Sequence, residues 1–110
     1  MNKIEFKDGI VYAKVNHHFA QDDIHEIIDA VEENSAKATL LDFSQYDTIL
    51  QSSAIGMLIS LHRDLKEIDV PVGLCGMHKH NVAVFEMAGL DKIVKVYKTI
   101  KDGENGITTD

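Results

Sequence analysis

The spacing of apolar residues changes period several times along the chain. Ile4 and Phe6 alternate with charged residues, and Asp8-Gly9 is a strong signal for a two-residue turn ahead of the apolar run from Ile10 to Val15. Residues 1–15 are therefore predicted to form a β-hairpin. The following segment has helical spacing, with apolar residues at Ile24, Ile27, Ile28 and Val31.

A strand, a helix and a second strand are predicted within residues 40–75. Leu40 to Phe43 is a short apolar run, residues 54–68 return to helical spacing, and Val70 to Cys75 is again strand-like. Such a βαβ unit places its two strands parallel, with a right-handed crossover.

The rest of the chain predicts one more helix and one more strand. The helix is expected over Asn81 to Ala88 with Gly89 ending it, and the strand over Ile93 to Tyr97. The order of elements predicts a single α/β domain with a mixed sheet of about four to five strands and helices mostly on one face. Residues 1–100 are assigned to this domain, and residues 101–110, which are polar and contain Gly103 and Gly106, to a flexible C-terminal tail.

Composition narrows the classes of function. The 110 residues are 45% hydrophobic and 26% charged, which is typical of a globular protein. The net charge of −7 argues against nucleic acid as a partner, because no basic patch is evident. No apolar run reaches the roughly 20 residues of a membrane helix, no signal peptide is evident, and the single Cys75 suits a reducing compartment. We therefore expect a cytoplasmic protein without membrane insertion.

Ser52 and Ser53 are the residues with the most chemical interest. They stand at the start of the predicted helix, where N–H groups lack intrahelical partners and the helix dipole is positive. A phosphate on either serine would be partly stabilised there. Ser is also a favoured N-cap of any helix, so an ordinary cap is the commoner explanation.

Cofactor, metal and catalytic sites have little support in the sequence. The six histidines are not spaced as metal ligands, and neither a phosphate-binding glycine motif nor a nucleophile elbow is present. Cys75 lies inside an apolar strand, where a thiol is usually inert. We expect no metal, no cofactor and no enzymatic activity.

Two stretches together resemble a known family. The run LLDFSQYDTILQSSAIGMLISLHRDLKEIDVPVGLCG and the later VFEMAGLDKIVKVY are similar to the STAS domain of bacterial anti-sigma factor antagonists. Asp42-Phe43-Ser44 corresponds to the family's first motif, Gln51-Ser52-Ser53-Ala54 to its Asp-Ser-Ser motif at a helix start, and Gly89-Leu90-Asp91 to its last turn.

This resemblance implies a partner switch in transcription regulation. The unmodified antagonist would bind an anti-sigma factor that is also a serine kinase, phosphorylation would release it, and a PP2C-type phosphatase would restore it. Ser52 corresponds to the phosphorylated serine, with Ser53 as the fallback. The partner-binding residues implied are Asn16, His17, Gln51, Ser52, Ser53, Ala54, Ile55 and Met57. The oligomeric state is left open.

Two alternatives keep Ser52 but give it another role. Gln51 stands where the family has Asp, which favours a constitutive scaffold subunit of a larger complex, such as a lipid-transport ATPase, with Ser52 as a plain cap. A small hydrolase with Ser52 as nucleophile would need a base, which only His17 or His78 could supply.

Overall fold

The computed structural model describes residues 3–107, and its elements follow the predicted order with two additions, a short 3₁₀ helix before the last strand and a final α-helix. The elements are β1 (Lys3–Lys7), β2 (Ile10–Asn16), α1 (Gln21–Asn34), β3 (Ala38–Gln45), α2 (Ser52–Lys66), β4 (Val72–Cys75), α3 (Lys79–Met87), the short 3₁₀ helix η1 (Leu90–Lys92), β5 (Lys95–Tyr97) and α4 (Ile100–Ile107). The first two residues of the predicted hairpin and the last three of the predicted tail lie outside the described residues.

The five strands form one mixed sheet in the order β1-β2-β3-β4-β5. The hairpin β1–β2 is antiparallel, and its turn has positive φ at both Asp8 (53°) and Gly9 (83°), which matches the twist of the strands. The pairs β2–β3, β3–β4 and β4–β5 are parallel. The predicted fold class and the parallel βαβ unit are confirmed.

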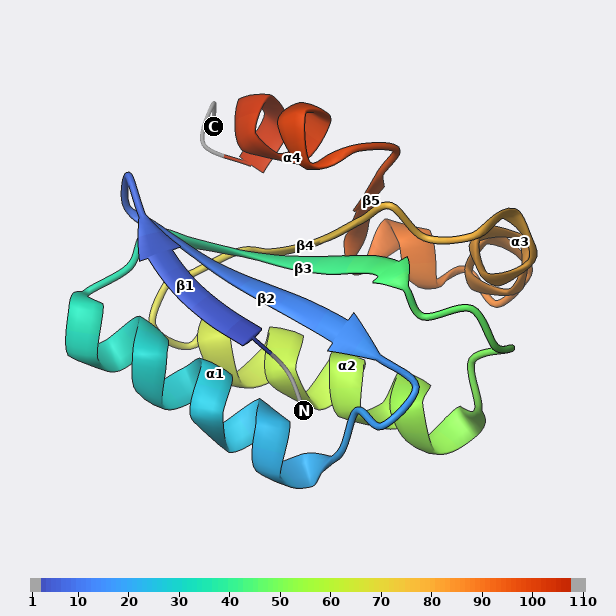
Figure 1. Ribbon diagram of the computed structural model, residues 1–110, viewed down its shortest axis with the longest axis horizontal. Coiled ribbons are helices and arrows are strands. Elements are labelled where there is room, and N and C mark those ends of the chain that lie inside the picture. The colour runs from blue at the N-terminus through green and yellow to red at the C-terminus, as the bar shows by residue number, and fades with distance from the viewer. Residues whose placement is uncertain (1–2, 108–110) are drawn as a thin grey trace.

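Helices α1 and α2 cover one face of the sheet (Figure 1). The apolar stripe of α1, represented by Ile24, Ile27 and Val31, packs in the same core as Leu58, Leu61 and Leu65 of α2. The strands contribute their inward-facing residues to this core, including Val11, Leu41, Phe43 and Leu74. The domain thus buries its main core between the sheet and these two helices.

The opposite face carries α4, where the sequence predicted a flexible tail (Figure 1). The prediction is wrong for residues 101–107, which belong to this helix. Ile107 is buried in a second cluster with Leu40 and Cys75, and a Cβ on Gly103 would lie 2.6 Å from the Cys75 Sγ. Glycine lowers local helix propensity, yet here it allows the helix to approach the sheet closely. Tyr12 strengthens this contact, because its hydroxyl donates a hydrogen bond to Glu104.

Candidate functional site

The first turn of α2 presents both serines to solvent. The helix begins at Ser52, so Ser52 and Ser53 occupy its first two positions, and both residues are exposed. The N-cap is Gln51, which is extended (φ −87°, ψ 159°), and its carbonyl accepts the Ile55 N–H at 3.1 Å. The N–H groups of Ser52, Ser53 and Ala54 precede this first bond, so they have no intrahelical acceptor.

The interpretation of Ser52 as a plain helix cap is wrong. Capping requires the residue just outside the helix, and that position belongs to Gln51, whose side chain makes no cap hydrogen bond. The helix begins earlier than the apolar pattern indicated, because polar residues can occupy its exposed first turn. Ser52 therefore lies inside the helix at an uncapped N-terminus.

Asn81 holds the loop that leads into this turn, a role that sequence analysis missed. Its side chain is fully buried near the start of α3 and forms hydrogen bonds with two residues of the loop between β3 and α2. The Asn81 amide nitrogen donates to the Thr48 carbonyl at 2.9 Å, and its amide oxygen accepts the Leu50 N–H at 2.9 Å. Both bonds join residues more than 30 positions apart, so no local pattern could have predicted them.

The predicted partner residues Asn16 and His17 lie at the same end of the sheet. Asn16 ends β2 and pairs with Gln45 at the end of the parallel strand β3, so both strands release their loops at one edge. Phe19 anchors the loop after β2 in the core, while His17 and His18 are exposed with ring centroids 4.1 Å apart. The C-terminal ends of β2 and β3 therefore place the segment with Asn16 and His17 and the loop that leads to Ser52 at the same end of the sheet.

The remaining predicted residues differ in accessibility. Ile55 and Met57 are half-buried and pack against the core, and Gln51 is exposed. Ala54 is only 5% exposed, so its side chain contributes to the core rather than to a contact surface. The exposed part of the predicted set is therefore His17, Gln51 and the two serines.

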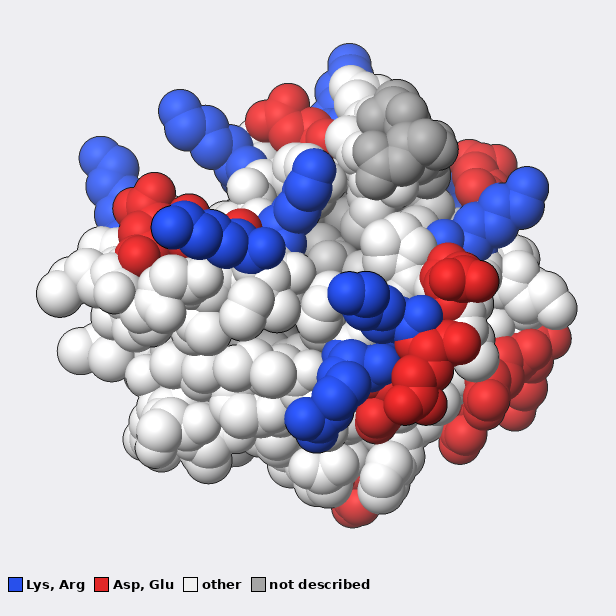
Figure 2. Space-filling view, turned by 180° about the vertical axis from the view of Figure 1, so that it is seen from behind, with Lys and Arg blue, Asp and Glu red and all other residues white. Residues whose placement is uncertain are grey.

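The surface around the first turn of α2 is uncharged. No Asp, Glu, Lys or Arg occurs from Thr48 to His62, although 26% of the chain is charged. Figure 2 shows the result as a broad face without charged side chains at its lower left, where the loop and the first half of α2 lie after the rotation from Figure 1. Ile49, in this loop, is 66% exposed. The length of this uncharged run was a signal available in the sequence.

Neither His17 nor His78 is placed as a general base for Ser52 in the described part of the chain. The His78 Nε2 lies 3.2 Å from the Ser44 carbonyl, and His17 is in ring contact with His18. Within residues 3–107, no histidine is hydrogen-bonded to the Ser52 hydroxyl. Burial raises the pKa of the Cys75 thiol to about 12, so the thiol is protonated at neutral pH. Neither side chain is arranged as an activated nucleophile.

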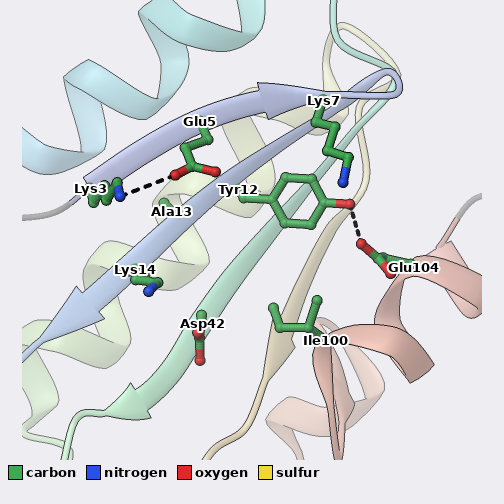
Figure 3. Close-up of a pocket in the computed structure, with 9 residues that line it drawn as sticks. All are labelled: Lys3, Glu5, Lys7, Tyr12, Ala13, Lys14, Asp42, Ile100 and Glu104. Atoms are coloured by element: carbon green, nitrogen blue, oxygen red, sulfur yellow. Dashed lines mark hydrogen bonds and ion pairs between the residues drawn. The ribbon is translucent and has the colours of Figure 1, made fainter.

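A hollow lies between the hairpin and α4 (Figure 3). It has a volume of about 220 Å³, and its charged lining residues are Lys3, Glu5, Lys7, Lys14, Asp42 and Glu104. Lys3 pairs with Glu5 at 3.3 Å, and Glu104 accepts the Tyr12 hydroxyl. Burial, followed by the contact with Glu104, raises the pKa of Tyr12. The three lysines and three carboxylates balance in charge, and α4 contributes Ile100 and Glu104 to the wall of the hollow.

Among residues 3–107, no helix is long and apolar enough to cross a membrane. The same residues contain no cluster of three or more side chains of the metal-binding types.

Comparison with known proteins agrees with this architecture. The solved structures that are similar include TM1081 of Thermotoga maritima (TM-score 0.82, 18% identity, 96% of this chain and 93% of that chain). They also include an anti-sigma factor antagonist from Mycobacterium paratuberculosis (TM-score 0.73, 22% identity, 97% and 92%). A third is the Bacillus cell fate determinant SpoIIAA in its phosphorylated form (TM-score 0.69, 16% identity, 96% and 97%).

At these identities the structural likeness shows the fold, and the family follows from the sequence itself. The family model described as "STAS domain" matches residues 9–103, which run from β2 through the βαβ unit to the first part of α4. The chain therefore belongs to the STAS domain family.

Proposed function

We propose that this protein is an anti-sigma factor antagonist whose docking to an anti-sigma factor is switched by phosphorylation of Ser52. The observation that carries the proposal is the exposed serine pair at an uncapped helix start within an uncharged surface. Two of the similar structures, the Mycobacterium paratuberculosis antagonist and phosphorylated SpoIIAA, support the same assignment.

The start of α2 can carry a phosphate on Ser52 without loss of the helix. A phosphoserine carries about −1.5 to −2 charges, and the free N–H groups and helix dipole at the start of α2 favour such a charge. The helix would therefore survive modification. A partner packed on the uncharged face would have to bury the phosphate without a counter-charge from this chain, which weakens binding strongly.

The partners follow from this switch. The binding partner is an anti-sigma factor with serine kinase activity, and a PP2C-type phosphatase restores the unmodified form. The protein itself is a cytoplasmic, non-catalytic binding module. Ser53, the second exposed serine of the turn, is the alternative acceptor.

A constitutive scaffold is the second candidate, and Gln51 is the observation that favours it. The N-cap of α2 is a neutral amide where the family pattern has a carboxylate, so recognition by a kinase could be lost. A STAS-type fold also occurs in a sulfate transporter family protein from Wolinella succinogenes (TM-score 0.74, 14% identity). In this function Ser52 remains unmodified and the complex is permanent.

The test begins with the protein purified from its own cells. Trypsin should release residues 38–63 as one peptide, and fragment-ion mapping then assigns any phosphate to Ser52 or Ser53. Affinity capture from the same cells compares wild type with Ser52→Ala, Ser52→Asp and the control Ser35→Asp. Ser35 is exposed at the far end of α1 and has the left-handed φ (50°) that Asp tolerates.

We expect Ser52→Ala and Ser35→Asp to capture the same partner as wild type, and Ser52→Asp to lose it at least tenfold. Equal capture by all variants, with no phosphate on either serine during growth or stress, would refute the switch and favour the scaffold.

A further inference from the structure

The sheet has an open edge at β5. Among the described strands β5 pairs only with β4, so its other edge has no strand neighbour. An edge strand presents N–H and C=O groups that another extended segment can pair with. The strand is three residues long, Lys95–Tyr97, and the Tyr97 carbonyl accepts the Gly76 N–H at 3.3 Å on the β4 side. Because the backbone groups of alternate residues point to opposite edges, the N–H and C=O groups on the open side are those of Val96.

A groove runs between this edge and α3. Its volume is about 900 Å³, within the range of ligand-binding clefts. Its apolar lining combines Phe85, which is fully buried, with the half-buried Val82 and Val96. A free strand edge beside a helix, with apolar side chains between them, is the arrangement in which extended peptides add a strand to a sheet.

The charged residues that line the groove carry a small positive excess, although the net charge of the chain is −7. Lys92, Lys95, Lys98 and Lys101 fall within ten residues that contain no Asp or Glu. Lys95 and Lys98 are exposed and line the groove, and Lys79 lines it from α3. Figure 2 shows several Lys or Arg side chains at the upper left, where β5 lies after the rotation from Figure 1, with Asp or Glu side chains among them. Glu86 and Asp91 also line the groove, so the excess is one positive charge.

We propose that the groove between β5 and α3 binds an extended acidic segment of a partner protein, which pairs with β5 as a sixth strand. Backbone hydrogen bonds to the β5 edge provide the pairing, and the lysines select acidic side chains. Apolar residues at alternate positions of the segment would contact Val82 and Val96. This surface is distinct from the first turn of α2, so the proposal stands independently of the phosphorylation switch.

Lysines on an edge strand also have a protective use. Natural proteins place them there to prevent edge-to-edge aggregation. That explanation requires no ligand, and it predicts that removing Lys95 and Lys98 causes self-association without any loss of peptide binding. The two explanations therefore differ in a measurable way.

The experiment uses the full chain and a fluorescein-labelled peptide of eight residues with alternating glutamate and valine. Fluorescence anisotropy compares wild type with the double variant Lys95→Glu/Lys98→Glu. The control is Lys7→Glu/Lys14→Glu, which changes the net charge equally on β1 and β2, at the opposite side of the sheet. Circular dichroism checks that each variant is folded, and Ser52→Asp serves to separate this site from the switch.

Two further peptides test strand pairing itself. Each carries N-methyl groups on alternate residues, one on the valines and the other on the glutamates. Because alternate N–H groups of a strand point to opposite edges, pairing with β5 predicts that one peptide loses binding and the other keeps it.

We expect at least tenfold weaker binding for Lys95→Glu/Lys98→Glu, less than a twofold change for the control, and none for Ser52→Asp. Absence of binding to wild type at millimolar peptide would overturn the proposal. An equal loss of peptide affinity in both double variants would show non-specific charge attraction and overturn the proposal. Equal binding of the two N-methylated peptides would overturn strand pairing with β5. The proposal would also be overturned if the wild-type chain formed a dimer and the substitutions Lys95→Glu/Lys98→Glu dissociated it. The occupant of the groove would then be a second copy of this chain.

Discussion

Replacing Asn81 by Ala tests how the loop before Ser52 is held. The substitution removes the donor to the Thr48 carbonyl and the acceptor of the Leu50 N–H, both bonded at 2.9 Å. The Thr48 bond is only partly buried, so water can replace its partner at a cost of about 1 kcal/mol. The Leu50 bond is buried, and leaving its N–H unpaired costs about 1–3 kcal/mol. We expect a total loss of about 2–4 kcal/mol in the free energy of unfolding.

His80→Ala is the matched control for this prediction. Its Nε2 lies 3.5 Å from the same Thr48 carbonyl, but the contact is exposed. We therefore expect less than about 0.5 kcal/mol of destabilisation. Urea unfolding followed by circular dichroism gives both values, and hydrogen exchange of the Leu50 amide reports on the loop directly.

Asn81→Asp should make the free energy of unfolding depend on pH. The carboxylate keeps an acceptor for the Leu50 N–H but faces the Thr48 carbonyl oxygen without a proton to donate. Burial raises the pKa of this carboxyl above its ordinary value of about 3.9, so protonation is favoured in the folded state. The variant should therefore be least stable at neutral pH and recover toward wild type as the pH falls. The reasoning is refuted if Asn81→Ala unfolds at the same urea concentration as His80→Ala and the Leu50 amide keeps its protection.

Three further substitutions and one reactivity test check the packing. Gly103→Val should destabilise the protein by about 2 kcal/mol or more, because its Cβ would lie 2.6 Å from the Cys75 Sγ; an unchanged melting temperature would contradict the close packing of α4. Gly56→Ala, at an exposed helical position with no heavy atom within 4 Å of the added Cβ, should instead stabilise by about 0.5–1 kcal/mol in the same melting assay. Cys75, whose pKa burial raises to about 12, should not react with Ellman's reagent at pH 8 until urea unfolds the chain; rapid native reaction would show that the α4 face opens. The unfolded thiol ionises near pH 9 while the folded one stays protonated, so the free energy of unfolding should fall as the pH rises from about 9 toward 12, and Cys75→Ala should lose that part of the slope.

Local spacing was sufficient for most of the secondary structure. The turn at Asp8-Gly9, the apolar stripe of α1 and the βαβ unit depend on neighbours within a few residues, and all are present. Gly89 has the left-handed φ (73°) expected of a residue that follows a helix. The position of Ser52 near a helix start also follows from local spacing. The apolar residues change from strand-like to helical spacing after the loop, and this change alone places Ser52 close to the start of α2.

The tertiary structure decided the features that depend on distant contacts. Helix α4 contains two glycines and has weak local propensity, so it is explained by packing of Ile107 and Gly103 on the sheet. Asn81 is an ordinary polar residue in the sequence and becomes a buried tie only because α3 folds beside the loop that precedes α2. The groove beside β5 likewise exists only where α3 meets the last strand. The sequence by itself determined the elements and their order, because periodicity is local; the supports of the site and its second surface required the fold, because their partners lie far apart along the chain.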